Sequence, residues 1–182
     1  MPRFVVSILL MALALPATAA DYVQGPGSSL VFAGEYQDEV FTGRFPGFHT
    51  RLHFDPAQLA TSSLDVTIPI ASVTTGNQDY DENMRGDAFF DAAKFPQAHY
   101  TATRFRSLGG NQYAADGTLS LHGVSKPVTL TFTWTPGAQP VLAGKATVPR
   151  LAFGIGGGDF ADTGLMPDAI AVSTKVVLQP AK

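Results

Sequence analysis

The sequence predicts an all-β fold, an extended antiparallel barrel of about eight strands with a short helical insertion. Three observations lead to this prediction. Apolar and polar residues alternate with a period of two along most of the chain, glycines and prolines interrupt the alternation, and one segment lacks it. Such alternation marks strands that turn one face to an apolar interior and the other to water.

The alternation is clearest in five runs, and in each run the apolar residues share one parity. The runs are residues 48–54, 63–70, 113–121, 128–134 and 170–176. In the fourth run, the apolar residues alternate with three threonines. We therefore expect each run to form a strand, with Val, Leu, Ile and Phe side chains facing the interior.

Turn signals separate these runs at Pro46-Gly47, at Gly109-Gly110-Asn111, at Pro136-Gly137 and in the glycine-rich segment 154–158. Residues 78–93 lack alternation, carry acidic residues early and end before Pro96, which predicts one or two short helical turns. We favour a barrel over a sandwich because closure removes strand edges, and these strands carry few charges that could protect an edge.

Residues 1–20 have the layout of a secretory signal peptide. Arg3 precedes an apolar run at residues 4–15, and Pro16 and four small residues follow it. As a helix the run would span about 18 Å, which is short of the ~30 Å core of a bilayer. We expect cleavage after Ala19 or Ala20, which leaves residues 21–182 as one exported domain. Because the chain has no cysteine for disulfides, we expect it in the periplasm.

Composition excludes several classes of function. Without cysteine there are no thiolate metal sites and no thiol catalysis. The net charge is −3 and no basic cluster occurs, so the chain offers nothing that would bind a nucleic-acid backbone or an anionic lipid surface.

One acidic motif is similar to the start of a calcium-binding loop. Asp79, Asp81 and Asn83 match the first three ligand positions. The position that needs glycine holds Met84, and the position that needs a bidentate glutamate holds Phe90. We interpret the motif as the solvated start of a helix.

Other motifs also fail to support catalysis or metal binding. His49 and His53 would lie about 13 Å apart on a strand, too far to share one zinc ion. The glycine run at 154–158 is not followed by the Lys-Ser or Lys-Thr of a phosphate loop, and no Gly-x-Ser-x-Gly occurs. Asp87 and Asp91 could meet in space, but nothing near them indicates the burial that would tune them. We expect no catalytic residues, no metal and no required cofactor.

From composition and pattern alone, a filled barrel and a barrel with a cavity both stay open. Thirteen phenylalanines, five tyrosines and one tryptophan are many for a small domain. The small residues Ala102, Ala115 and Gly117 fall at predicted inward positions, and these would leave room for a ligand.

Several stretches, in order, resemble the YceI-like family of bacterial periplasmic proteins over nearly the whole of residues 21–182. They are residues 43–48 followed by 53–55, residues 68–77 running into Asp81, residues 83–96 and residues 117–130. Arg150, Phe153 and Gly154 are similar to the family's late Arg-x-x-Phe-Gly motif. Ala152 stands where the family usually has an acidic residue, so the motif lacks that carboxylate as an ion-pair partner for Arg150.

The resemblance implies a lipocalin-like barrel that encloses a polyisoprenoid or an isoprenoid quinone in an apolar channel, with no catalytic residues to carry over. We therefore expect a periplasmic lipid-binding and transport protein, with an isoprenoid lipid as the bound partner. Contact with a membrane or a membrane protein, and a homodimer, stay open. Candidate ligand-contact residues are Phe32, Phe48, Leu52, Phe54, Leu64, Val66, Ile68, Phe89, Phe90, Tyr100, Leu119, Leu121, Leu130, Phe132, Trp134 and Phe153.

Two alternatives come from other classes of function. A filled barrel that acts as an interaction module, for instance beside a membrane redox protein, predicts an exposed apolar patch and no cavity. A hydrolase of lipid or glycan predicts buried carboxylates converging near Asp87, Asp91 and Arg150.

Overall fold

The structure, a computed structural model, describes residues 20–181. Ten strands form one antiparallel sheet, and eight of them close into a barrel in the order β1-β4-β5-β6-β7-β8-β9-β10 with β10 paired back to β1. The barrel strands are β1 (Ala20–Gln24), β4 (His49–Phe54), β5 (Ser63–Pro69), β6 (Gln97–Gly109), β7 (Gln112–Leu121), β8 (Val124–Thr135), β9 (Val141–Pro149) and β10 (Ala169–Pro180). The predicted fold class is confirmed. Residues 1–19 of the predicted signal segment lie outside the described residues. Its last residue, Ala20, is the first residue of β1.

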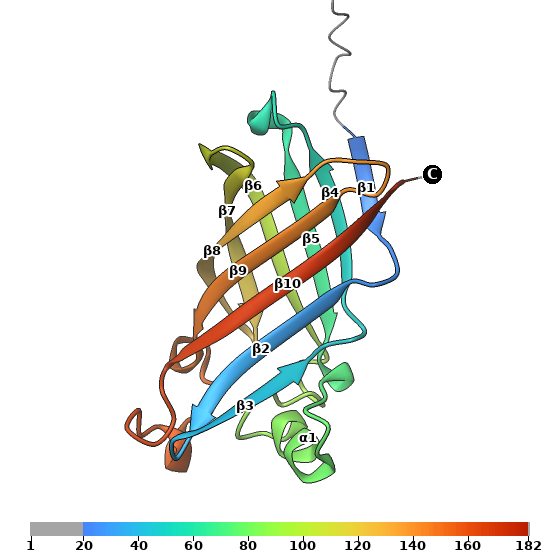
Figure 1. The fold of residues 1–182 in the computed structure, drawn as a ribbon. Coiled ribbons are helices and arrows are strands. Elements are labelled where there is room, and N and C mark those ends of the chain that lie inside the picture. The colour runs from blue at the N-terminus through green and yellow to red at the C-terminus, as the bar shows by residue number, and fades with distance from the viewer. Residues whose placement is uncertain (1–19, 182) are drawn as a thin grey trace, which may run out of the picture.

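The remaining two strands, β2 (Ser29–Tyr36) and β3 (Glu39–Arg44), extend one side of the wall. β10 runs diagonally across the barrel in Figure 1, with β9 along one side and β2 and then β1 along the other. The inward face of the β2–β3 hairpin is built from two pairs, Phe32 opposite Gly43 and Gly34 opposite Phe41. Each ring lies where a side chain on the opposing glycine would stand, so apolar surface covers both glycines.

The two ends of the barrel differ, as Figure 1 shows. The α1 end carries helix α1 (Gln78–Arg85), the β2–β3 turn and the segment 150–168. The far end carries the β6–β7 and β8–β9 turns together with residues 55–62. Between the described strands lie four short 3₁₀ helices, η1 (Leu59–Thr61), η2 (Ile70–Ser72, directly after β5), η3 (Arg150–Phe153) and η4 (Gly158–Phe160).

Helix α1 confirms the predicted helical insertion, although it is shorter than the segment 78–93. The Asn77 side chain caps its first turn by accepting from the backbone N–H groups of Asp79 and Tyr80. The helix ends at Arg85 with Gly86 as its C-cap, and turns follow up to residue 94. No helix among residues 20–181 is long and apolar enough to cross a membrane.

Candidate ligand cavity

An apolar cavity lies inside the barrel, toward the α1 end. It offers about 180 Å³ of space that the centre of a water molecule can reach, and the wall surface facing that space is apolar throughout. Strands β2–β10 contribute to the wall, so residues far apart in the sequence meet there. Of the alternatives that the sequence left open, the structure shows the barrel with a cavity.

Eleven of the sixteen predicted contact residues line this cavity. They are Phe32, Phe48, Leu64, Val66, Ile68, Phe89, Phe90, Tyr100, Leu119, Leu121 and Leu130. The other five do not line it. Leu52, Phe54, Phe132 and Trp134 fill the far half of the barrel, and Phe153 is fully buried in η3.

The far half of the barrel is closed by an aromatic plug, which we define as Phe54, Phe105, Tyr113, Phe132 and Trp134. Phe54, only 1% exposed, is its centre. Its ring centroid lies 4.9 Å from Trp134, 5.1 Å from Tyr113, 5.6 Å from Phe132 and 5.9 Å from Phe105. These are favourable aromatic separations, and the plug leaves no part of the described cavity on its far side.

The small residues expected to make room for a ligand do not line the cavity. Gly117 is covered by the Tyr100 ring, because a Cβ there would lie 2.5 Å from Tyr100 Cζ. Ala102 and Ala115 are almost fully buried. The prediction that these three positions create the cavity was wrong, since a larger neighbour fills the space above Gly117 and the two alanines are buried outside the cavity wall.

Tyr100 is the one tyrosine of the cavity wall among the described residues. Its hydroxyl donates a hydrogen bond of 2.8 Å to the carbonyl of Ala115 and lies 3.1 Å from that of Val128. Burial raises the pKa of Tyr100 to about 12. The phenol therefore stays neutral at physiological pH, and its polar atom is directed into the wall.

At the α1 end, side chains carried by connecting segments cover the cavity. Phe45, which follows β3, packs against Phe90 with ring centroids 5.7 Å apart, and Phe89 packs against Phe160 at 5.0 Å. Ile155 and Met166, from the segment 150–168, also line the cavity. Loop residues therefore cover this end, whereas strand residues close the other.

The segment 150–168 is organised around Arg150, which is 2% exposed. Its guanidinium donates five hydrogen bonds of 2.6–3.1 Å to backbone carbonyls, those of Ile155, Gly156, Phe160, Met166 and Pro167. Burial lowers the pKa of Arg150, and the Asp168 carboxylate opposes this effect. Backbone dipoles take the place of the missing acidic neighbour, and all five donors are occupied.

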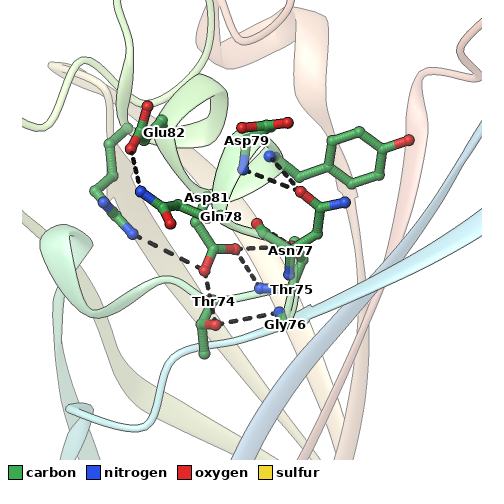
Figure 2. Close-up of polar contacts among 10 residues, drawn as sticks. Thr74, Thr75, Gly76, Asn77, Gln78, Asp79, Asp81 and Glu82 are labelled. Carbon is green, nitrogen blue, oxygen red and sulfur yellow. Dashed lines mark hydrogen bonds and ion pairs between the residues drawn. The ribbon is translucent and has the colours of Figure 1, made fainter.

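Asp81 joins helix α1 to the segment after β5, as Figure 2 shows. Its carboxylate accepts from the hydroxyls of Thr74 (2.8 Å) and Thr75 (2.7 Å) and from the backbone N–H of Thr75. Thr74 in turn pairs with Arg44 at the end of β3 through two backbone hydrogen bonds. The acidic motif therefore has a structural role that the sequence reasoning did not find.

The Thr75 N–H, the two hydroxyls and the nearby Arg85 guanidinium hold the pKa of Asp81 below its ordinary value of 3.8. Because its pKa is lower in the folded state than in the unfolded state, the ionised Asp81 carboxylate stabilises the fold. This contribution is complete above pH 3.8 and is lost as the pH falls through the lowered pKa. We expect Asp81→Asn to lower the thermal midpoint at pH 7, and the difference from wild type to shrink below pH 3.8. Melting curves between pH 7 and pH 2 check this. Asp79→Asn, at an exposed position of the same helix, is the control, and an unchanged difference at low pH would contradict the assignment.

Thr50 lines the cavity but was not predicted, although it shares the parity of Phe48 and Leu52. It was missed because its side chain is polar. It is 3% exposed, and its hydroxyl has no hydrogen-bond partner among the residues that the structure describes. Leaving a buried hydroxyl unpaired costs about 1–3 kcal/mol.

We expect Thr50→Val to raise the free energy of unfolding by about 1 kcal/mol, because a methyl group replaces the unpaired hydroxyl. Urea denaturation measures the change. Thr133→Val, on the outward face of β8, should change stability by less than about 0.5 kcal/mol. Destabilisation by Thr50→Val would mean that the hydroxyl has a partner.

The structure also bears on the metal-site and hydrolase hypotheses. Among residues 20–181, no group of three or more His, Asp or Glu side chains is placed to hold a metal ion. The His53 ring lies within hydrogen-bonding distance of the Asp21 carboxylate, with Nδ1 2.7 Å from Oδ1. Arg150 has no free donor for a carboxylate or a substrate, which removes one of the three residues on which the hydrolase hypothesis depended.

Comparison with known proteins gives consistent matches. A family model described as the YceI-like domain matches residues 22–178. A UPF0312 protein of Vibrio vulnificus strain YJ016 is 31% identical over 141 residues, covering 75% of each chain. Another, from Shewanella denitrificans, is 35% identical over 130 residues, covering 68% of each chain.

Solved structures share the fold. Burkholderia cenocepacia BcnA superposes with a TM-score of 0.79 at 30% identity, covering 82% of this chain and 95% of that one. A domain from Saccharophagus degradans, described as polyisoprenoid binding, superposes with a TM-score of 0.69 at 16% identity, covering 90% of this chain and all of that one.

Proposed function

This chain belongs to the YceI-like family, and from that premise we propose that it binds the apolar chain of an isoprenoid lipid inside its barrel and carries it through the periplasm. The observation that carries the proposal is the cavity with an apolar wall inside the barrel. The Saccharophagus domain described as polyisoprenoid binding has the same fold, which is consistent with this function. The predicted signal peptide supports the periplasmic location.

The chemistry of the wall selects the part of the ligand that enters. Moving a polar group into an apolar site without a hydrogen bond costs several kcal/mol, and the wall surface facing the cavity offers no polar atom as a partner. A hydrocarbon chain meets no such penalty. The isoprenoid tail therefore enters the barrel, and the head group, whether a quinone or a phosphate, stays at the α1 end.

The energetics suit a carrier better than a permanent store. Each CH₂ group moved from water into the cavity contributes about 0.8 kcal/mol. The same group is already out of water in a bilayer, so the preference for the protein over a membrane is much smaller. A modest preference lets the lipid be taken up and released again.

The cavity also separates this proposal from the interaction module, which predicted a filled barrel. No specific observation favours a hydrolase, because the candidate residues near Arg150 do not form a site with free donors.

Native mass spectrometry of the mature protein purified from its host, followed by extraction of any adduct, tests the proposal. We expect one bound isoprenoid lipid, on a chain whose mass reports cleavage after Ala19 or Ala20. Ala146→Phe, which places a ring in the cavity, should remove the adduct. Ala143→Phe, at an exposed position of the same strand, should keep it. A protein that stays unloaded even after incubation with isoprenoid-containing vesicles would refute the function.

A further inference from the structure

The cavity ends at a floor inside the barrel. On strands from different sides of the wall, one inward residue lines the cavity and the next inward residue toward the far end does not. The pairs are Thr50 and Leu52 on β4, Leu130 and Phe132 on β8, and Val176 and Leu178 on β10. A layer of side chains therefore closes the cavity, and Phe132 is the largest of the three.

Residues of paired strands form this floor, whereas loop residues cover the α1 end. Phe132 is 3% exposed, and its ring centroid lies 5.6 Å from Phe54, 5.6 Å from Tyr113 and 6.2 Å from Phe105. All four residues belong to strands that are hydrogen-bonded on both sides. A ligand chain could displace these rings only by disturbing a close-packed interior, so the floor limits how far it can enter.

The depth of the cavity follows from the strands that line it. On β10, the lining residues run from Ile170 to Val176. On the β5 side, they run from Leu64 to Ile70. In each case the first and last lining residues are six positions apart. Six residues span about 20 Å of strand, or about 15 Å along the barrel axis at the usual tilt. A fully extended polypeptide advances at most about 3.6 Å over the three backbone bonds of one residue. By the same measure, the four main-chain bonds of an isoprene unit extend about 5 Å.

We propose that the cavity holds about three isoprene units and that Phe132, together with the other rings of the aromatic plug, sets this chain-length limit. The inference rests on the proposed function and narrows its ligand class to chains of about fifteen carbons. Units beyond the limit remain outside the cavity, where their apolar surface returns to water whenever the complex leaves a membrane.

Uptake of prenyl alcohols of two, three, four and eight units from phosphatidylcholine vesicles tests this limit. The vesicles are separated from the protein, and the alcohol bound to the mature protein is quantified. We expect uptake to be greatest at three units and to fall by roughly tenfold or more for each added unit. The eight-unit alcohol should stay in the vesicles.

Two variants move the floor in opposite directions. Phe132→Ala removes the largest side chain of the floor layer and opens up to about 5 Å of depth beneath it, so the best-bound ligand should become the four-unit alcohol. Val176→Phe fills the deepest lining position on β10 and should shift the optimum to two units. Phe95→Ala removes a ring that packs on His122 outside the cavity, and it should lose stability without shifting the optimum.

The possible outcomes are distinct. Uptake that peaks near three units and moves with the floor variants supports the limit. Equal or better uptake of the eight-unit alcohol by the wild type overturns the limit while leaving isoprenoid binding intact. No uptake of any alcohol by a folded protein overturns the proposed function, and the limit with it.

Discussion

Replacing Arg150 with methionine is expected to lower the free energy of unfolding by about 3 kcal/mol or more. Hydrogen bonds that involve a charged group contribute about 1.5–3 kcal/mol each, and five such bonds are lost together. The carbonyls of Gly156 and Met166 accept at 2.6 Å, and a methionine thioether offers them no donor. Urea denaturation measures the loss.

The conservative and control variants sharpen this test. Arg150→Lys keeps the charge but has three donors on one atom, so we expect an intermediate loss. Arg104→Met removes an exposed guanidinium that lies 3.7 Å from Asp116 and should change stability by less than about 0.5 kcal/mol. If Arg150→Met behaved like Arg104→Met, the segment 150–168 would be held by its apolar contacts alone.

The second large effect is expected for Phe54→Ala, at the centre of the aromatic plug. Deleting a fully buried phenylalanine ring costs about 3–5 kcal/mol, and Phe54 packs against four other rings. Leu108→Ala, half-exposed at the end of β6, should cost less than about 0.5 kcal/mol.

Combining Phe54→Ala with Phe132→Ala tests whether the plug acts as a unit. The two rings lie 5.6 Å apart, so each single variant already removes their contact. We expect the double variant to lose less stability than the two single variants together, by about 0.5–3 kcal/mol. Strict additivity would show that the rings pack independently.

Strand parity predicted most of the inward face, and where it failed the reason is local. On β6, the register shifts between Ala102 and Arg104, so Phe105 faces inward although Tyr100 and Ala102 have the opposite parity. On β2 and β3, glycines occupy inward positions under phenylalanines from the neighbouring strand. A glycine in an apolar position weakens the alternation, which is why these strands were not among the five clear runs.

The division of the barrel into cavity and plug was not predictable from parity. Leu130 and Phe132 are neighbours of the same parity and similar hydrophobicity, yet only Leu130 lines the cavity. The difference comes from three rings on other strands, those of Phe54, Phe105 and Tyr113, which pack against Phe132. The arrangement of the five carbonyls around Arg150 likewise depends on the path of the backbone, which the alternation of residues does not predict.

The junction between Arg44 and Thr74 has a consequence for how the wall deforms. Long ladders of hydrogen bonds join the eight barrel strands, whereas among residues 20–181 the pairing of β3 with the segment after β5 is one isolated bridge. Opening this bridge breaks two backbone hydrogen bonds, and the Asp81 contacts are its main reinforcement. Local opening free energies are lowest where few bonds are broken, so amide protons near Thr74 should exchange with solvent long before those of the ladders. Substitutions at this junction should therefore change the rate of local opening of the wall more than they change the global stability, to which the plug and the ladders also contribute.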